Sequence, residues 1–124
     1  MFSHIMIGTN DLERAKKFYD SLLGTLGIKP AVIDGHRIFY RSSTGLFSVT
    51  QPIDGQPASA GNGETLGFAA SSPEQVQAWH TAGLAAGGTA IEDPPGIREG
   101  KGMKLYLAYL RDPDGHKICA LHRM

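Results

Sequence analysis

The residue types that are rare in this sequence exclude several classes of protein before any motif is considered. It contains one cysteine, Cys119, which excludes a disulfide within the chain and favours a reducing compartment such as the cytoplasm. Its 12 Lys and Arg residues balance 12 Asp and Glu residues, so no basic surface is predicted. We therefore expect no nucleic acid or anionic membrane as a partner.

Long apolar runs are also missing. No segment approaches the ~20 apolar residues that are needed to span a bilayer, and the first residues show no charged leader followed by an apolar core. We therefore expect a cytoplasmic protein without a signal peptide. With 124 residues, of which 41% are hydrophobic and 19% charged, the chain has the size and composition of a single domain with a real core.

What the sequence has is an internal repeat. Residues 3–28 and 64–89 share one pattern at an offset of 61 (64 − 3): a short apolar run, a polar cluster, and an amphipathic stretch that ends in Leu-x-x-x-Gly. Phe18 of the first copy corresponds to Trp79 of the second. Internal repeats of this kind indicate that one structural unit occurs twice.

A second correspondence lies near the end of each copy. Residues 45–50 (GLFSVT) and 116–121 (HKICAL) match at an offset of 71 (116 − 45). The chain is therefore predicted to contain two modules, residues 1–51 and residues 64–124, joined by a polar connector at residues 52–63.

Each module is predicted to hold one helix and four strands. The first helix is capped by Asn10 or Asp11, and its strands are expected at 2–9, 31–34, 37–42 and 45–51. The second helix is capped by Ser72 with Pro73 at its first position, and its strands are expected at 64–70, 89–92, 103–111 and 116–121. Residues 93–102 are predicted to form a loop. The order β-α-β-β-β, found twice, indicates an α+β fold.

Four sequence features resemble the vicinal-oxygen-chelate superfamily, which includes glyoxalase I, bleomycin-resistance proteins, extradiol dioxygenases and fosfomycin-resistance enzymes. They are His4 in the first strand, the helix start NDLERAKKFY at residues 10–19, Leu84-x-x-x-Gly88, and DPDGHKI at residues 112–118. The resemblance covers essentially the whole chain. It implies two βαβββ modules that form a curved, partly open eight-stranded sheet with a central pocket.

The resemblance also implies up to four metal ligands in metal-dependent members, one on the first and one on the last strand of each module. The repeat offsets place these positions at His4 and Thr65 and at Ser48 and Cys119. Family members typically carry His and Glu there, whereas this chain keeps only His4. Hydroxyl groups are weak ligands and no carboxylate is present, so no cofactor is expected and no metal is expected to bind in the family's manner.

The remaining candidates line the implied pocket. Tyr109 lies three residues before Asp112, where a Tyr reaches the ligand in fosfomycin-resistance-like relatives; the alternative is a sheet Tyr that packs against the helices. Ser48, Thr50 and Thr65 would add hydroxyl groups. Cys119 is either a small buried apolar residue or, beside His4, a nucleophilic thiolate.

Three hypotheses follow. The first is a homodimeric, glyoxalase/bleomycin-resistance-like protein that binds a small organic molecule in the concavity of the sheet, without the divalent metal. The alternative is a metal-dependent lyase or dioxygenase of the glyoxalase type with altered ligands, such as His4 and Cys119 plus a His from elsewhere in the chain. In that case the metal would polarise the substrate. The third is thiol chemistry at Cys119, activated by His4.

Overall fold

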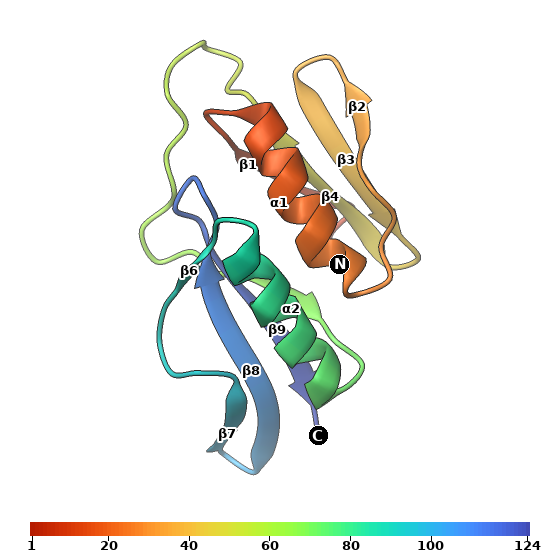
Figure 1. Ribbon diagram of the computed structural model, residues 1–124, viewed down its shortest axis with the longest axis vertical. Helices are drawn as coiled ribbons and strands as arrows, with labels where there is room; N and C mark the ends of the chain where they lie inside the picture. Colours follow the sequence, from red (N-terminus) through yellow and green to blue (C-terminus); the bar gives the residue numbers. More distant parts are fainter.

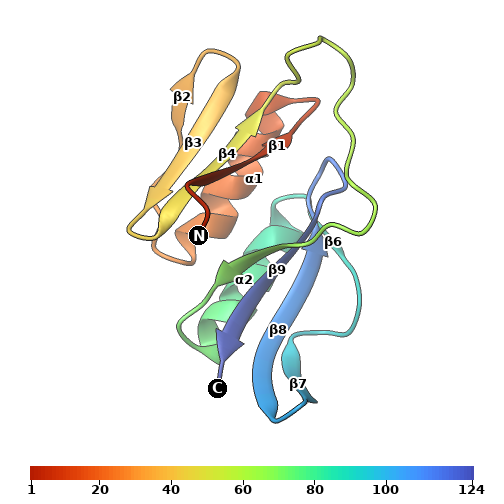
Figure 2. The ribbon, with the colours of Figure 1, turned by 180° about the vertical axis from the view of Figure 1, so that it is seen from behind.

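Two helices cover one face of two β-sheets, as the computed structural model of residues 1–124 shows (Figure 1). From behind, the sheets face the viewer and the helices lie beneath them (Figure 2). The elements in chain order are β1 (His4–Gly8), α1 (Leu12–Gly24), β2 (Val32–Asp34), β3 (Arg37–Ser42), β4 (Gly45–Thr50), β5 (Leu66–Ala69), α2 (Pro73–Ala85), β6 (Thr89–Ala90), β7 (Gly96–Gly100), β8 (Met103–Arg111) and β9 (Lys117–Arg123).

The first sheet has the order β1-β4-β3-β2, with β1 parallel to β4 and the other pairs antiparallel. The turn between β2 and β3 is tight because Gly35 adopts a positive φ of 61°, which a residue with a side chain rarely does. The α1 helix begins where the Asp11 side chain accepts a hydrogen bond from the Arg14 amide, at 3.0 Å. These signals are local, and the sequence contained all of them.

The second sheet has the order β5-β9-β8, and both β6 and β7 pair with the free edge of β8. The prediction of a loop at residues 93–102 was therefore wrong, because Gly96–Gly100 forms a strand. This segment lacks apolar alternation, and its backbone pairs with an edge that the nine-residue β8 leaves open. The fold is α+β and not closed, as expected, but it has nine strands in two sheets rather than eight in one.

Both modules use the same strand register. Met6 lies opposite Ser48 in the parallel pair of the first module, and Gly67 lies opposite Cys119 in that of the second. Those partners are separated by the same two offsets, 61 (67 − 6) and 71 (119 − 48), that the sequence repeat shows. Equivalent residues of the two modules therefore occupy equivalent places on the two sheets.

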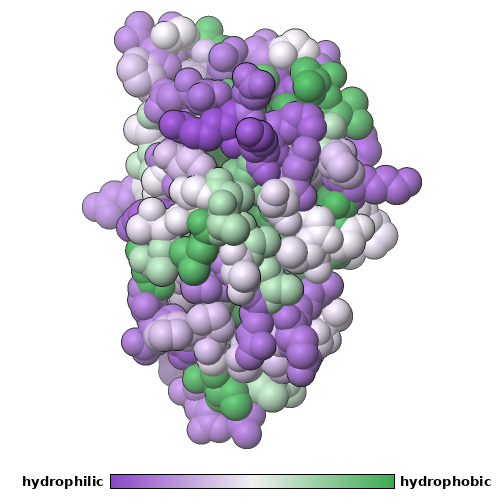
Figure 3. Space-filling model, in the orientation of Figure 1, coloured by the Kyte–Doolittle hydropathy of each residue, from purple (hydrophilic) through white to green (hydrophobic).

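The core lies between the helices and the sheets. The inward stripe of α1 includes Phe18 and Leu22, and that of α2 includes Val76 and Trp79; all four side chains are fully buried. Seen from the helix side, the surface is mostly hydrophilic, with a paler, more apolar band across its middle (Figure 3). No helix is both long and apolar enough to cross a membrane.

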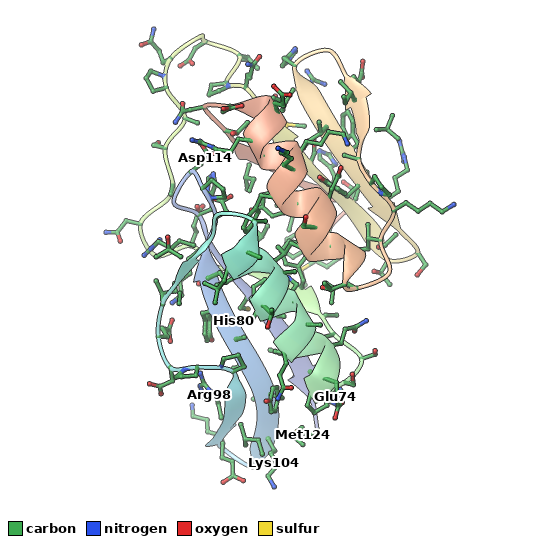
Figure 4. The ribbon with its side chains drawn as sticks, in the orientation of Figure 1. Glu74, His80, Arg98, Lys104, Asp114 and Met124 are labelled. Atoms are coloured by element: carbon green, nitrogen blue, oxygen red, sulfur yellow. The ribbon has the colours of Figure 1, made fainter.

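Polar contacts join the two modules around the turn between β8 and β9. The buried Tyr19 hydroxyl on α1 donates to Asp112 Oδ2 at 2.6 Å, and the Thr9 hydroxyl donates to Asp114 Oδ2 at 2.6 Å. Asp114 also accepts a hydrogen bond from Arg14 at 2.8 Å, and it lies beside the start of α1 (Figure 4). This turn, DPDG, is thus a connector between modules as well as a hairpin turn.

Candidate functional site

The candidate site lies on the open face of the sheets, which the helices do not cover (Figure 2). In β9, Ile118 and Ala120 belong to the core under the helices, so Cys119 between them faces the other way. Tyr109 lies directly opposite Cys119 in the register of β8 and β9 and shares its face. By the same alternation, His4 and Ser48 belong to the open face of the first sheet, because Phe47 and Val49 are core residues.

His4 lies at the surface, at the start of β1, and is exposed. Its Nδ1 atom shares a hydrogen bond with the Ser3 hydroxyl, at 2.8 Å. The ring thus has only a local partner. Thr65, the residue that the repeat pairs with it, is exposed immediately before β5 and lines a cleft.

The hydroxyl groups of Ser48 and Thr50 are already used within the protein. Ser48 is fully buried, and its Oγ donates to the Ile38 carbonyl at 2.8 Å. The Thr50 hydroxyl donates to the Gln51 carbonyl at 2.8 Å. Each group would have to exchange a backbone partner before it could donate to a ligand, and their predicted role in binding stays a prediction.

Cys119 is buried, with 6% of its surface exposed. Burial raises the pKa of its thiol to about 11, although the nearby Lys117 ammonium acts in the opposite direction. The sulfur also lies against the backbone of β5, since a Cβ atom placed on Gly67 would be 3.2 Å from it. These surroundings keep the group a neutral thiol at neutral pH.

A lysine ammonium lies over the ring of Tyr109. Lys117 Nζ lies 4.9 Å from the ring centroid, and the same ammonium forms an ion pair with Glu92. Burial raises the pKa of Tyr109, so its hydroxyl stays protonated at neutral pH. The side chain therefore offers an aromatic face and a hydroxyl group on the open face of the second sheet.

The four positions to which the resemblance assigns metal ligands do not fit a divalent ion here. They contribute one imidazole, two hydroxyls and one thiol whose pKa is raised to about 11. Nowhere in the structure do three His, Cys, Asp or Glu side chains come together as a metal-binding group. Because zinc and similar ions need several imidazole, carboxylate or thiolate donors, this donor set supports no step through a metal.

A cleft of about 430 Å³ opens beside Thr65, between the end of the connector and the last two strands. Its lining consists of Ala60, Gly61, Asn62, Gly63, Glu64, Thr65, Arg111 and Lys117. Sequence reasoning missed Arg111 and Lys117. The signal was available, because each lies two residues from a predicted site residue, Tyr109 or Cys119, and residues two apart on a strand share a face.

The Glu64 carboxylate, which lines the cleft, is paired with the buried ring of His116. His116 is buried, with Nε2 2.7 Å from the Gly8 carbonyl and Nδ1 2.9 Å from Glu64 Oε1. Both partners are acceptors, so we assign the ring as an imidazolium that donates twice. Burial alone would lower the pKa of His116, but these hydrogen bonds outweigh it and raise the pKa. The bond from His116 in turn lowers the pKa of Glu64.

Comparison with known proteins identifies the family. The model of the Glyoxalase/Bleomycin resistance protein/Dioxygenase superfamily matches residues 1–120. This chain belongs to that superfamily. A glyoxalase/bleomycin resistance protein from Albidiferax ferrireducens T118 is 68% identical to it, with 99% of each chain covered and a TM-score of 0.97.

More distant members of the superfamily share the fold. A glyoxalase/bleomycin resistance protein/dioxygenase family enzyme from Burkholderia phytofirmans PsJN is 17% identical, with 98% of each chain covered and a TM-score of 0.75. Lactoylglutathione lyase from Agrobacterium tumefaciens is 17% identical, with a TM-score of 0.66 over 98% of this chain and 92% of its own. Among curated proteins, none matches this chain.

Proposed function

We propose that this glyoxalase-superfamily protein binds a small organic molecule on the open face of its sheets, without the divalent metal that metal-dependent relatives use. The observation that carries the proposal is the donor set: Ser48 is committed to a backbone carbonyl, and Cys119 is a buried thiol whose pKa is raised to about 11. Two further positions, His4 and Thr65, cannot complete a coordination sphere by themselves.

The shape and chemistry of the open face support a ligand of small-molecule size. The cleft of about 430 Å³ beside Thr65 has a volume typical of ligand pockets. Lys117 lines the cleft, and its ammonium lies over the ring of Tyr109, which belongs to the same face. The cleft itself is lined mainly by polar and glycine residues, so Tyr109 beside it supplies the aromatic surface that small-molecule sites commonly use.

Metal content tests the proposal directly. We expect far less than one ion per chain, by elemental mass spectrometry, in protein from cultures supplied with nickel, zinc, manganese and iron. A chelator should also leave the melting temperature unchanged, because a metal bound only to the folded state would stabilise it.

About one ion per chain that is lost in His4→Ala would overturn the proposal and favour the metal-dependent lyase or dioxygenase hypothesis. His36→Ala is the matched control, since His36 lies exposed in the turn between β2 and β3. An ion that His4→Ala keeps and His36→Ala loses would lie outside the family's site and leave the proposal standing.

The proposal includes a homodimer in the cytoplasm. The edge strand β2 exposes Val32 and Ile33, at 65% and 61%, which is apolar surface that a second copy would cover. The single free thiol suits a reducing compartment. Light scattering should give twice the 13.3 kDa mass of one chain, and a mass of one chain would contradict the dimer.

A further inference from the structure

Two cations lie directly opposite each other in the cleft. In the antiparallel pair of β8 and β9, Arg111 is the register partner of Lys117, and both residues line the cleft. Like charges that face each other across two strands destabilise a sheet. A pair of this kind therefore suggests that the two groups have a common anionic partner.

The charges around the cleft do not cancel. Lys117 pairs with Glu92. The Glu64 carboxylate accepts one hydrogen bond from the His116 imidazolium and one from the Gly61 amide, each at 2.9 Å. Arg111 forms no ion pair: its Nη1 donates to the neutral Gly115 carbonyl at 2.8 Å. One guanidinium charge in the cleft is thus left without a carboxylate.

Two residues that line the cleft together with Arg111 have backbone amides without a partner. The amides of Asn62 and Gly63 make no hydrogen bond within the protein, and both residues line the cleft. Thr65 adds an exposed hydroxyl group to the same wall. Amides and hydroxyls near a cation are the groups from which proteins build sites for oxyanions.

We propose that the cleft binds the oxyanion group, a carboxylate or a phosphate, of the small molecule. The planar guanidinium of Arg111 bonds two of its oxygens, and Lys117 adds a second charge that Glu92 partly screens. The rest of the molecule extends over Tyr109. This inference rests on the proposed function and names the ligand class: small organic anions.

Amide NMR titrations of the folded protein provide the test. The probes are inorganic phosphate, benzoate and its neutral isostere benzamide, at pH 7 and constant ionic strength. We expect saturable shifts of the Asn62, Gly63 and Thr65 amides with phosphate, with benzoate, or with both. The anion that produces these shifts, phosphate or benzoate, identifies the oxyanion group. Benzamide should bind at least about tenfold more weakly than benzoate.

Charge variants separate binding from folding. Arg111→Gln should weaken anion binding by about tenfold or more, because a charge-assisted hydrogen-bond donor is lost. Arg41→Gln is the matched control, an exposed arginine on β3 of the other module. Glu92→Gln should tighten binding, because it releases Lys117 from its ion pair, and a general loss of stability would not produce tighter binding.

Three results would overturn the inference. The first is the absence of saturable shifts in the cleft with both anions. The second is equal loss of binding in Arg111→Gln and Arg41→Gln. The third is equal affinity for benzoate and benzamide, with shifts at Tyr109 and Cys119. This third result would reject the anion site and still support small-molecule binding on the open face, so the two proposals can fail separately.

Discussion

The surroundings of each side chain on the open face determine its chemistry. A cysteine beside a lysine would be expected to ionise easily, because the ammonium favours the thiolate. Here burial outweighs the charge of Lys117 and raises the pKa of Cys119 to about 11. This environment argues against the thiol hypothesis, in which Cys119 acts as a nucleophile.

We expect Cys119 to react slowly with iodoacetamide at pH 8. An ordinary thiol has a pKa of ~8.5, so the thiolate fraction of Cys119 should be lower by roughly two orders of magnitude. The rate in the folded protein should therefore be at least ~10-fold below that in ~6 M urea, where the same residue is unfolded. If Cys119 reacted faster in the folded protein than in the unfolded protein, the result would support the hypothesis that Cys119 is a nucleophile.

At the scale of the elements, the repeat pairs glycines that serve different purposes. Gly27, after α1, has a φ of 80° and open space around its Cα, so it is needed for its backbone conformation. Its counterpart Gly88, after α2, is needed for space. A Cβ atom there would lie 2.9 Å from the Gly83 carbonyl and 3.2 Å from the Arg111 carbonyl.

Gly88→Ala should therefore lower the free energy of unfolding by about 1–3 kcal/mol, because backbone atoms of α2 and β8 would have to move apart. The control is Gly24→Ala at the end of α1, where an added Cβ would meet nothing within 4 Å. That change should stay within about 1 kcal/mol. Urea unfolding measures both, and equal effects would contradict the packing argument.

At the scale of the whole molecule, a few polar groups join the modules. The imidazolium of His116 bonds Gly8 at the end of β1 and Glu64 just before β5. These two bonds link the first strands of both modules to the turn that precedes β9. Part of the contact between the modules therefore depends on an imidazolium whose pKa these hydrogen bonds raise.

This dependence has a defined sign. The pKa of His116 is raised in the fold, so its contribution is fully present below the ordinary value of 6.5 and is lost as pH rises through the higher folded value. The pKa of Glu64 is lowered, so its contribution is present above its ordinary 4.5 and is lost as pH falls through its folded value. Both contributions are complete between pH 4.5 and 6.5.

We expect His116→Gln to destabilise the protein most in this window, and the difference from wild type should shrink as the pH rises to 9. Urea unfolding at pH 6 and pH 9 measures it. The comparison with wild type at each pH removes the effect of other groups, such as His80, whose pKa is lowered by burial. A difference that is the same at both pH values would show that the ring acts without its charge.

Much of the candidate site could be predicted because strands alternate. Tyr109 and Cys119 do share the open face, as their places in the sequence imply. The cleft beside them could not be predicted, because it forms where the connector approaches β8 and β9. No local sequence pattern determines how closely these segments approach each other. Arg111 was overlooked although it lies two residues from Tyr109 and so shares its face, because an arginine before a turn is ordinarily a solvated residue.

The sequence by itself determined the helices, their caps, most strands and the family, because these depend on hydrophobic period, turn residues and motifs that are local in the chain. Only the tertiary structure decided three things: that Gly96–Gly100 is a strand, that Cys119 is a protonated thiol, and that Arg111 lacks a counter-ion. The reason is physical. Edge pairing, burial and the cancelling of charges depend on which distant segments meet, and that is settled by packing.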